Sequence, residues 1–88
     1  MLEIKTSSGF EIEINEQVLD NMELIDALSE LEDNEFAISK VTLLVLGKEG
    51  KKRLYDHLRR EDGTVPVQKV ADEIGEIFTS QTGEAGKN

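Results

Sequence analysis

The 88-residue sequence contains no cysteine and only one proline, one histidine and one tyrosine. Without cysteine there are no disulfides, thiolate metal sites or cysteine nucleophiles, and the composition suits a reducing compartment. No run of about 18 apolar residues is present, and the first residues, MLEIK, lack the basic-then-apolar form of a secretory signal. We expect one cytoplasmic domain. A chain of this length buries only about 60–65 % of the surface that it exposes when unfolded, so we expect its stability to depend on a partner.

Positive charge is missing from a long part of the chain. Between Thr6 and Ser39 there are ten Asp and Glu and no Lys or Arg, and the formal net charge of the chain is −9. Six of the ten basic residues then fall between Lys48 and Arg60. The negative net charge opposes binding to nucleic-acid phosphates, because such binding requires a dominant cationic surface. The acidic segment is either a solvated face or a docking surface for a basic partner.

The first fourteen residues predict a β-hairpin. Apolar and charged residues alternate over LEIKTSSGFEIEI with the period of two that strands require. Ser7-Ser8-Gly9 forms a three-residue connection, with glycine where a bulge needs it. Pairing Thr6 with Phe10 places the isoleucines at 4 and 12 opposite each other on one face. Because an isolated hairpin is marginal in water, that face should lie on the helices.

The rest of the sequence predicts about four helices, which makes the fold α+β. The first helix should start at an Asp20 cap and bury a stripe of Met22, Ile25, Leu28 and Leu31, with Leu24 at its margin. A basic helix should cover residues 48–60, and the last helix should run from Pro66 to about residue 80. Residues 1–80 are the predicted domain, and residues 81–88 a disordered tail.

Residues 36–46 admit both helix and strand. Val, Ile and Thr favour a strand, whereas Ser39 as a cap and Gly47 as a stop favour a short buried helix. The apolar run from Val41 to Leu46 belongs either to the core or to a surface shared with another chain. Nine residues are predicted to be core: Val41, Leu44, Leu54, Leu58, Val67, Val70, Ile74, Ile77 and Phe78.

A corner at residues 63–65 should join the last two helices. Glu61-Asp62-Gly63 has the form of a helix end, because glycine adopts the left-handed conformation at little cost. Pro66 suits the first turn of the next helix, where its missing N–H does no harm.

The sequence contains no pattern typical of a catalytic or metal site. His57 has no cysteine or second histidine to join it as a zinc ligand, so a packing role is the better interpretation. A calcium loop with Gly63 at its sixth position would put Leu58, Arg60 and Lys69 where carboxylates are required. The sequence also lacks a phosphate-binding glycine loop and a nucleophile elbow. We expect no enzyme, no cofactor and no metal.

The ordering of these segments resembles the tail assembly chaperones of long-tailed, siphovirus-type bacteriophages of Gram-positive hosts. The resemblance covers FEIEIN, DNMELIDALSELED, LLVLGKEGKKRLYDHLRREDG and VPVQKVADEIGEIF. Its most characteristic part is Leu46-Gly47, followed by Leu58, Glu61-Asp62-Gly63 and Val65-Pro66-Val67. Met22 stands where such chains often carry tryptophan, and methionine fills the same kind of gap.

The resemblance implies a non-enzymatic role in virion morphogenesis. Members of the family are thought to coat the long, helical tape measure protein in the host cytoplasm, keep it soluble until the tail tube forms, and be absent from the mature virion. The tail tube protein and further copies of the chain are secondary candidate partners; nucleic acid and membranes are not expected. Such families often make a longer form by a −1 frameshift, and Gly86-Lys87-Asn88 can be encoded with the slippery stretch A AAA AAC.

Two surfaces are candidates for contact with a client, and the sequence does not choose between them. One is the basic patch of Lys51, Lys52, Arg53, Arg59 and Arg60, and the other is the acidic helix face of Glu23, Asp26 and Glu30. The alternative function is an acidic inhibitory protein that occupies a nucleic-acid-binding site of a host enzyme. The segment without Lys or Arg motivates that alternative, and the basic patch argues against it.

Overall fold

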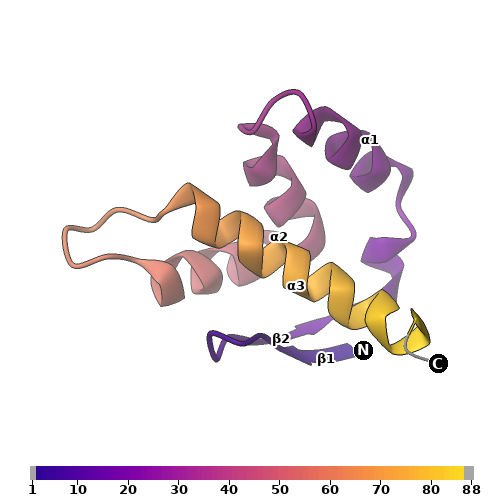
Figure 1. The fold of residues 1–88 in the computed structure, drawn as a ribbon, viewed down its shortest axis with the longest axis horizontal. Coiled ribbons are helices and arrows are strands. Elements are labelled where there is room, and N and C mark those ends of the chain that lie inside the picture. Colours follow the sequence, from indigo (N-terminus) through magenta and orange to yellow (C-terminus); the bar gives the residue numbers. More distant parts are fainter. Residues whose placement is uncertain (1, 87–88) are drawn as a thin grey trace.

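The structure, a computed structural model, describes residues 2–86, with side chains over residues 2–79. A hairpin of β1 (Leu2–Lys5) and β2 (Glu11–Ile14) is followed by a 3₁₀ helix, η1 (Glu16–Leu19) (Figure 1). Three helices complete the described part: α1 (Met22–Leu31), α2 (Ala37–Leu58) and α3 (Val67–Gly86). The α+β prediction is confirmed. The number of helices differs slightly from the expected four, because the two helices predicted before and after Gly47 are joined across a kink in one element, α2.

The hairpin has the predicted register. Leu2 pairs with Ile14 and Ile4 with Ile12, and the Thr6 N–H donates to the Phe10 carbonyl at 2.9 Å. Gly9 at the turn has φ 93°, a conformation that glycine adopts without a steric penalty. The period of two therefore puts one apolar face of the hairpin against the helices.

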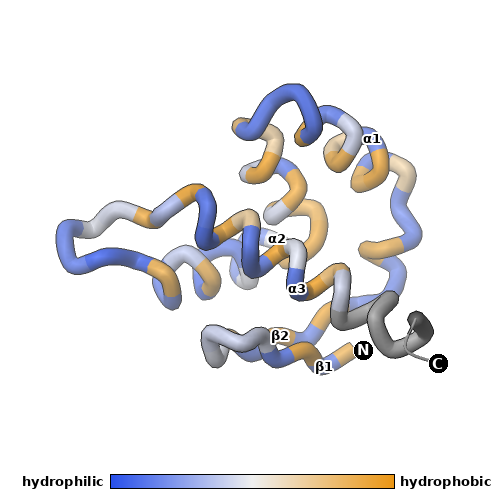
Figure 2. Tube along the Cα trace, viewed as in Figure 1, coloured by the Kyte–Doolittle hydropathy of each residue, from blue (hydrophilic) through white to orange (hydrophobic). Residues whose placement is uncertain are grey.

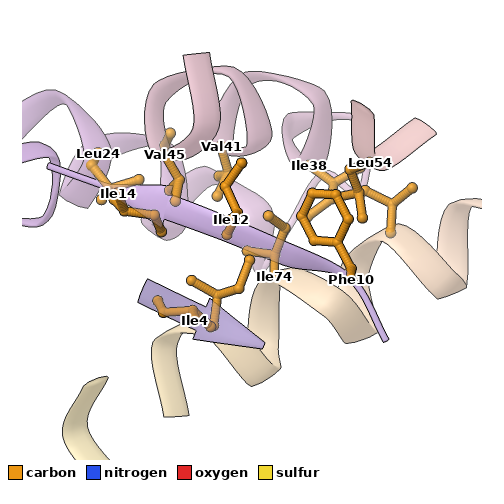
Figure 3. Packing of buried hydrophobic residues seen from close by; sticks show 13 residues of the cluster. Ile4, Phe10, Ile12, Ile14, Leu24, Ile38, Val41, Val45, Leu54 and Ile74 are labelled. Atoms are coloured by element: carbon orange, nitrogen blue, oxygen red, sulfur yellow. The ribbon is translucent and has the colours of Figure 1, made fainter. Parts of the chain in front are cut away.

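Helix α2 lies at the centre of the fold and contacts α1, α3, β2 and η1. Strand β1 lies against α3, so the hairpin spans both long helices (Figure 1). In Figure 3, side chains of β2 meet those of α2 and α3 in a single cluster, among them Ile12, Val41 and Ile74. The loops before α2 and before α3 are mainly hydrophilic and extend away from this cluster (Figure 2).

A kink at Gly47 divides α2 into two helical halves, at the position where the sequence predicts a helix stop. Gly47 has φ 77° and ψ 175°, a region of backbone space open essentially only to glycine. Helical geometry resumes beyond it, and the bend brings the Leu46 side chain against Gly50, which is buried. The segment from Phe36 to Leu46 is thus helical, apart from Phe36 itself, which caps the helix.

Helix α1 begins one residue later than predicted and is rotated. The Asn21 side chain, not that of Asp20, accepts the Glu23 N–H at 3.0 Å and caps the helix. Leu24 and Ala27 are buried, with Leu28 and Leu31 partly buried beside them. Met22 and Ile25, predicted for the core, are exposed. The apolar residues of α1 form two stripes, and packing against α2 buries the one that contains Leu24.

The corner before α3 is confirmed in outline and corrected in detail. Helix α2 already ends at Leu58, so Glu61-Asp62-Gly63 is not a helix end but part of a separate turn. Gly63 has φ 93°, and the Arg60 N–H donates to the Thr64 carbonyl at 2.8 Å across the turn. The Thr64 hydroxyl and N–H both donate to Asp62, which holds the pKa of that carboxyl below its usual value. Pro66 stands just before α3, and its carbonyl accepts from Val70.

Most of the predicted core is found, with one clear error. Val41, Leu54, Val70, Ile74 and Ile77 are buried. Three more predicted residues, Leu44, Leu58 and Phe78, are partly buried against the same cluster. Val67 is the exception, since 57 % of it remains exposed. Helix α3 continues to Gly86, beyond the predicted end at about residue 80. The disordered tail predicted over residues 81–88 and the frameshift proposed for residues 86–88 stay predictions, and residues 87–88 lie outside the described part.

Candidate partner-binding surfaces

The three cations at the start of the predicted basic patch follow one another on α2 and therefore point in different directions. The Lys51 ammonium donates to the Ser39 hydroxyl at 2.9 Å and lies 5.6 Å from the centre of the Tyr55 ring. Lys52 pairs with Asp56 one turn later, with 3.1 Å between Nζ and Oδ2. Arg53 instead reaches the hairpin.

Arg53 binds the hairpin through both charge and hydrogen bonding. Its guanidinium donates to the Glu11 carbonyl at 2.7 Å and lies 5.6 Å from the centre of the Phe10 ring. In the register of this hairpin the Glu11 carbonyl points to the outer edge of β2. Arg53 therefore covers part of an open sheet edge.

The other two cations of the patch organise the turn before α3. Arg59 donates to the Gly63 carbonyl and to Asp56, both at 2.9 Å, and Arg60 donates to the Thr64 hydroxyl at 3.1 Å. The Arg59 guanidinium, and after it the Lys52 ammonium, hold the pKa of the Asp56 carboxyl below its usual value. All five cations thus have intramolecular partners, and contact of the patch with a client stays a prediction.

The acidic face of α1 is a continuous surface. Glu23, Asp26 and Glu30 are exposed, and their spacing of three and four residues places them on one side of the helix. Met22 and Ile25 share the exposed part of α1, with 68 % and 49 % of each residue accessible. That this face meets a partner also stays a prediction.

Polar side chains fasten the turn of the hairpin to α2 and α3. The Thr6 hydroxyl donates to Glu73 at 2.7 Å, and both groups are buried, which satisfies a carboxylate that is only 4 % exposed. Ser7 donates to Glu76 through its N–H at 2.7 Å and its hydroxyl at 2.6 Å, and these bonds lower the pKa of the Glu76 carboxyl. The His57 ring packs on Phe10, with 5.5 Å between centroids, and its Nε2 lies 3.1 Å from the Ser8 hydroxyl.

An exposed apolar site lies where the two long helices begin. Phe36, the cap of α2, is 81 % exposed, and Val67 at the start of α3 lies across from it. Between them is a pocket of about 280 Å³, here called the Phe36 groove. Its lining residues are Glu35, Phe36, Ile38, Ser39, Tyr55, Val65, Val67 and Val70.

Local structure explains how the groove forms. The Asn34 side chain accepts the Phe36 N–H at 3.0 Å, which starts the first turn of α2 with the Phe36 side chain outward. The kink at Gly47 lets both halves of α2 contribute, Ile38 and Ser39 from the first and Tyr55 from the second. Sequence reasoning missed this site because it placed Val67 in the core.

Among the described residues, no group of three or more His, Asp or Glu side chains could hold a metal ion. None of the helices, within the part of the chain that the structure describes, is both long and apolar enough to cross a membrane. Comparison of the chain with protein-family models, with curated proteins and with solved structures finds no match.

Proposed function

We propose that the chain is a non-enzymatic tail assembly chaperone, which holds an apolar helical stretch of a phage tape measure protein in the Phe36 groove. The observation that carries the proposal is the groove itself, with Phe36 and Val67 exposed beside a buried floor of Ile38 and Val70. The resemblance to the phage chaperones supplies the identity of the client and the host cytoplasm as the place of action.

The physics of the groove suits a helical client. Covering an exposed aromatic side chain is favourable at roughly 25 cal/mol per Å² of apolar surface removed from water. Amphipathic helices bind such grooves by inserting apolar residues at spacings of three and four. A pocket of about 280 Å³ accommodates side chains rather than a whole helix, so the client helix would lie across the opening.

The charge of the chain suits the same role. A net charge of −9 keeps a complex soluble by repulsion between particles, even when the client is apolar. The exposed acids of α1 contribute to that charge, whereas Lys51, Arg53 and Arg59 bond to other parts of the chain. The proposal therefore places client contact at the groove and solubility on the acidic surface.

The experiment is co-expression with the tape measure protein from the same genome, scored by its solubility and by co-purification. Phe36→Ser should leave stability within about 0.5 kcal/mol, because the side chain is exposed. It should weaken co-purification at least about fivefold, as the loss of a central aromatic contact does. Met22→Ser, which removes a similarly exposed apolar side chain from α1, is the matched control and should have no effect.

Two results would contradict the proposal. If Phe36→Ser and Met22→Ser behave alike, the groove is not the client site. If the tape measure protein is equally insoluble with and without the wild-type chain, the chaperone function itself is wrong, and the acidic-inhibitor hypothesis becomes the stronger one.

A further inference from the structure

The outer edge of β2 carries main-chain groups that the fold leaves open. In an antiparallel pair, residues alternate between those that bond to the other strand and those whose N–H and C=O point away from it. Because Thr6 bonds to Phe10 across the hairpin, the observed register turns the N–H and C=O of Glu11 and Glu13 outward. The Glu11 carbonyl accepts from Arg53, whereas within the described part of the chain the N–H and C=O of Glu13 have no hydrogen-bond partner.

A hollow of about 620 Å³ lies along this edge. It extends from the exposed face of the hairpin to the second half of α2, where Glu49, Gly50 and Arg53 line it. Its volume is in the range of clefts that bind small ligands. Arg53 donates to the Glu11 carbonyl at 2.7 Å, which shows that a donor in the hollow reaches the main chain of this edge.

The charge around the hollow is negative. Four carboxylates and two cations line it: Glu3, Glu11, Glu13, Glu49, Lys5 and Arg53. Glu3 and Glu13 stand directly opposite each other in the register, a position at which like charges repel. Of the four acids, only Glu11 forms an ion pair among the described residues, with Lys5 at 3.7 Å. A cation beside Glu13 would therefore be favourable.

We propose that the outer edge of β2 binds an extended segment of a partner protein as a third, antiparallel strand, with Lys or Arg opposite Glu13. In such binding, main-chain hydrogen bonds supply affinity and alternate side chains supply specificity. A residue opposite Glu13 bonds to both its N–H and its C=O, and places its own side chain on the same face as the Glu13 carboxylate. The hollow shares no lining residue with the Phe36 groove, so this second surface goes beyond the proposed function.

Two other occupants fit the edge less well. A second copy of the chain, paired through its own β2, would set Glu11 and Glu13 against the same glutamates, and like charges on an edge strand hinder such self-pairing. A parallel strand opposite Ile12 would need the Glu11 carbonyl, which already accepts from Arg53. The antiparallel strand uses the open groups of Glu13 instead.

The test measures binding of a fluorescent, acetylated and amidated peptide, TKVKVKT, to the intact chain by anisotropy at low ionic strength. The peptide alternates lysine with valine or threonine, so that all lysines share one face of a strand. It should bind at least about tenfold more tightly than TEVEVET, which offers only like charges. In an antiparallel strand the lysine N–H groups face β2 and the valine N–H groups face away. N-methylation of the lysines should therefore abolish binding, and N-methylation of the valines should not.

Two variants of the chain form a matched pair. E13P and E3P each remove one exposed carboxylate and one N–H that points away from the other strand, so neither removes a hydrogen bond of the hairpin. E13P, on the edge of β2, should weaken binding of TKVKVKT about tenfold or more. E3P, on the edge of β1, should weaken it by no more than about fivefold, the effect of one lost ion pair. Urea unfolding shows that both variants are folded under the assay conditions.

Three results would overturn the inference. One is that TKVKVKT does not bind, or binds no better than TEVEVET. Another is that the two N-methylated peptides behave alike, which would mean attraction by charge alone, or that their order is reversed, which would mean a parallel strand. The third is that E3P weakens binding as much as E13P. Phe36→Ser should leave the affinity for TKVKVKT unchanged, so failure at this edge and failure at the Phe36 groove are distinguished.

Discussion

Two glycines in helical conformation should respond oppositely to the same substitution. Gly50 follows the kink of α2 and is buried, and Gly75 lies in the middle of α3 and is exposed. In both variants the change to alanine improves intrinsic helix propensity by about 0.8–1.0 kcal/mol. The difference between the variants therefore reports what the added Cβ meets in the folded protein.

The surroundings of the two positions set the magnitude. At Gly75 the added Cβ meets no atom within 4 Å apart from its chain neighbours and the backbone of its own helix, so G75A should stabilise the fold by roughly 0.5–1 kcal/mol. At Gly50 the added Cβ would lie 2.8 Å from Leu46 Cβ and 3.4 Å from Ile12 Cδ1. Leu46 Cβ is attached to backbone and cannot rotate away, so overpacking should cost about 1–3 kcal/mol. G50A should end up less stable than G75A by that amount.

Urea unfolding of the wild-type protein and the two variants, followed by circular dichroism, measures the difference. The slope of free energy against urea should stay the same, so that a change in midpoint reports stability alone. If G50A is as stabilising as G75A, Leu46 does not approach Gly50. The geometry that we describe for the kink would then be wrong.

Three further predictions concern the kink, the cap of α1 and the hairpin turn. G47A should lower the free energy of unfolding, measured in urea, by about 1–3 kcal/mol, because alanine cannot adopt φ 77° with ψ 175° without strain. An unchanged urea midpoint would argue for a straight α2. N21A should lower the free energy of unfolding by about 1 kcal/mol and D20A should change it little, because the Asn21 side chain caps α1. A larger loss for D20A than for N21A would instead place the cap at Asp20. Hydrogen bonds from Ser7 lower the pKa of Glu76 below its ordinary 4.5, so the stabilisation is present above about pH 4.5 and lost as pH falls through the lower folded value. The melting temperature of E76Q should therefore fall less steeply than that of wild type between pH 5 and 3, and parallel curves would refute the Ser7 contact.

The intramolecular use of the basic residues changes how the charge pattern of the chain is interpreted. A cluster of six cations in thirteen residues suggests a docking patch. Four of these side chains instead bond within the fold: Arg53 at the hairpin edge, Arg59 and Arg60 at the turn before α3, and Lys51 between the halves of α2. Each contact is charge-assisted and satisfies an oxygen acceptor. The patch therefore contributes to the architecture, and its contact with a client is left to the co-expression experiment.

Local signals in the sequence were sufficient for the hairpin and for the last helix. Alternation with a period of two, together with glycine at position 9, determines which side chains of β1 and β2 share a face and how they pair. The spacing of Val70, Ile74 and Ile77 likewise defines one face of α3, and all three are buried. In each case one apolar face dominates, so its burial follows without knowledge of the partner, except at Val67 on the first turn of α3, which is exposed.

Only the tertiary structure decided the rotation of α1, the extent of α2 and the site for a client. Helix α1 has apolar residues on two sides, and the packing of α2 determines that Leu24 is buried and Met22 is not. Gly47 could have ended a helix, but its position between two halves that both pack on the core makes it a kink. Phe36 and Val67 are exposed because the segments that begin α2 and α3 meet at the edge of the core. Local sequence determines backbone geometry and periodicity, whereas the choice of buried face depends on residues distant in the chain.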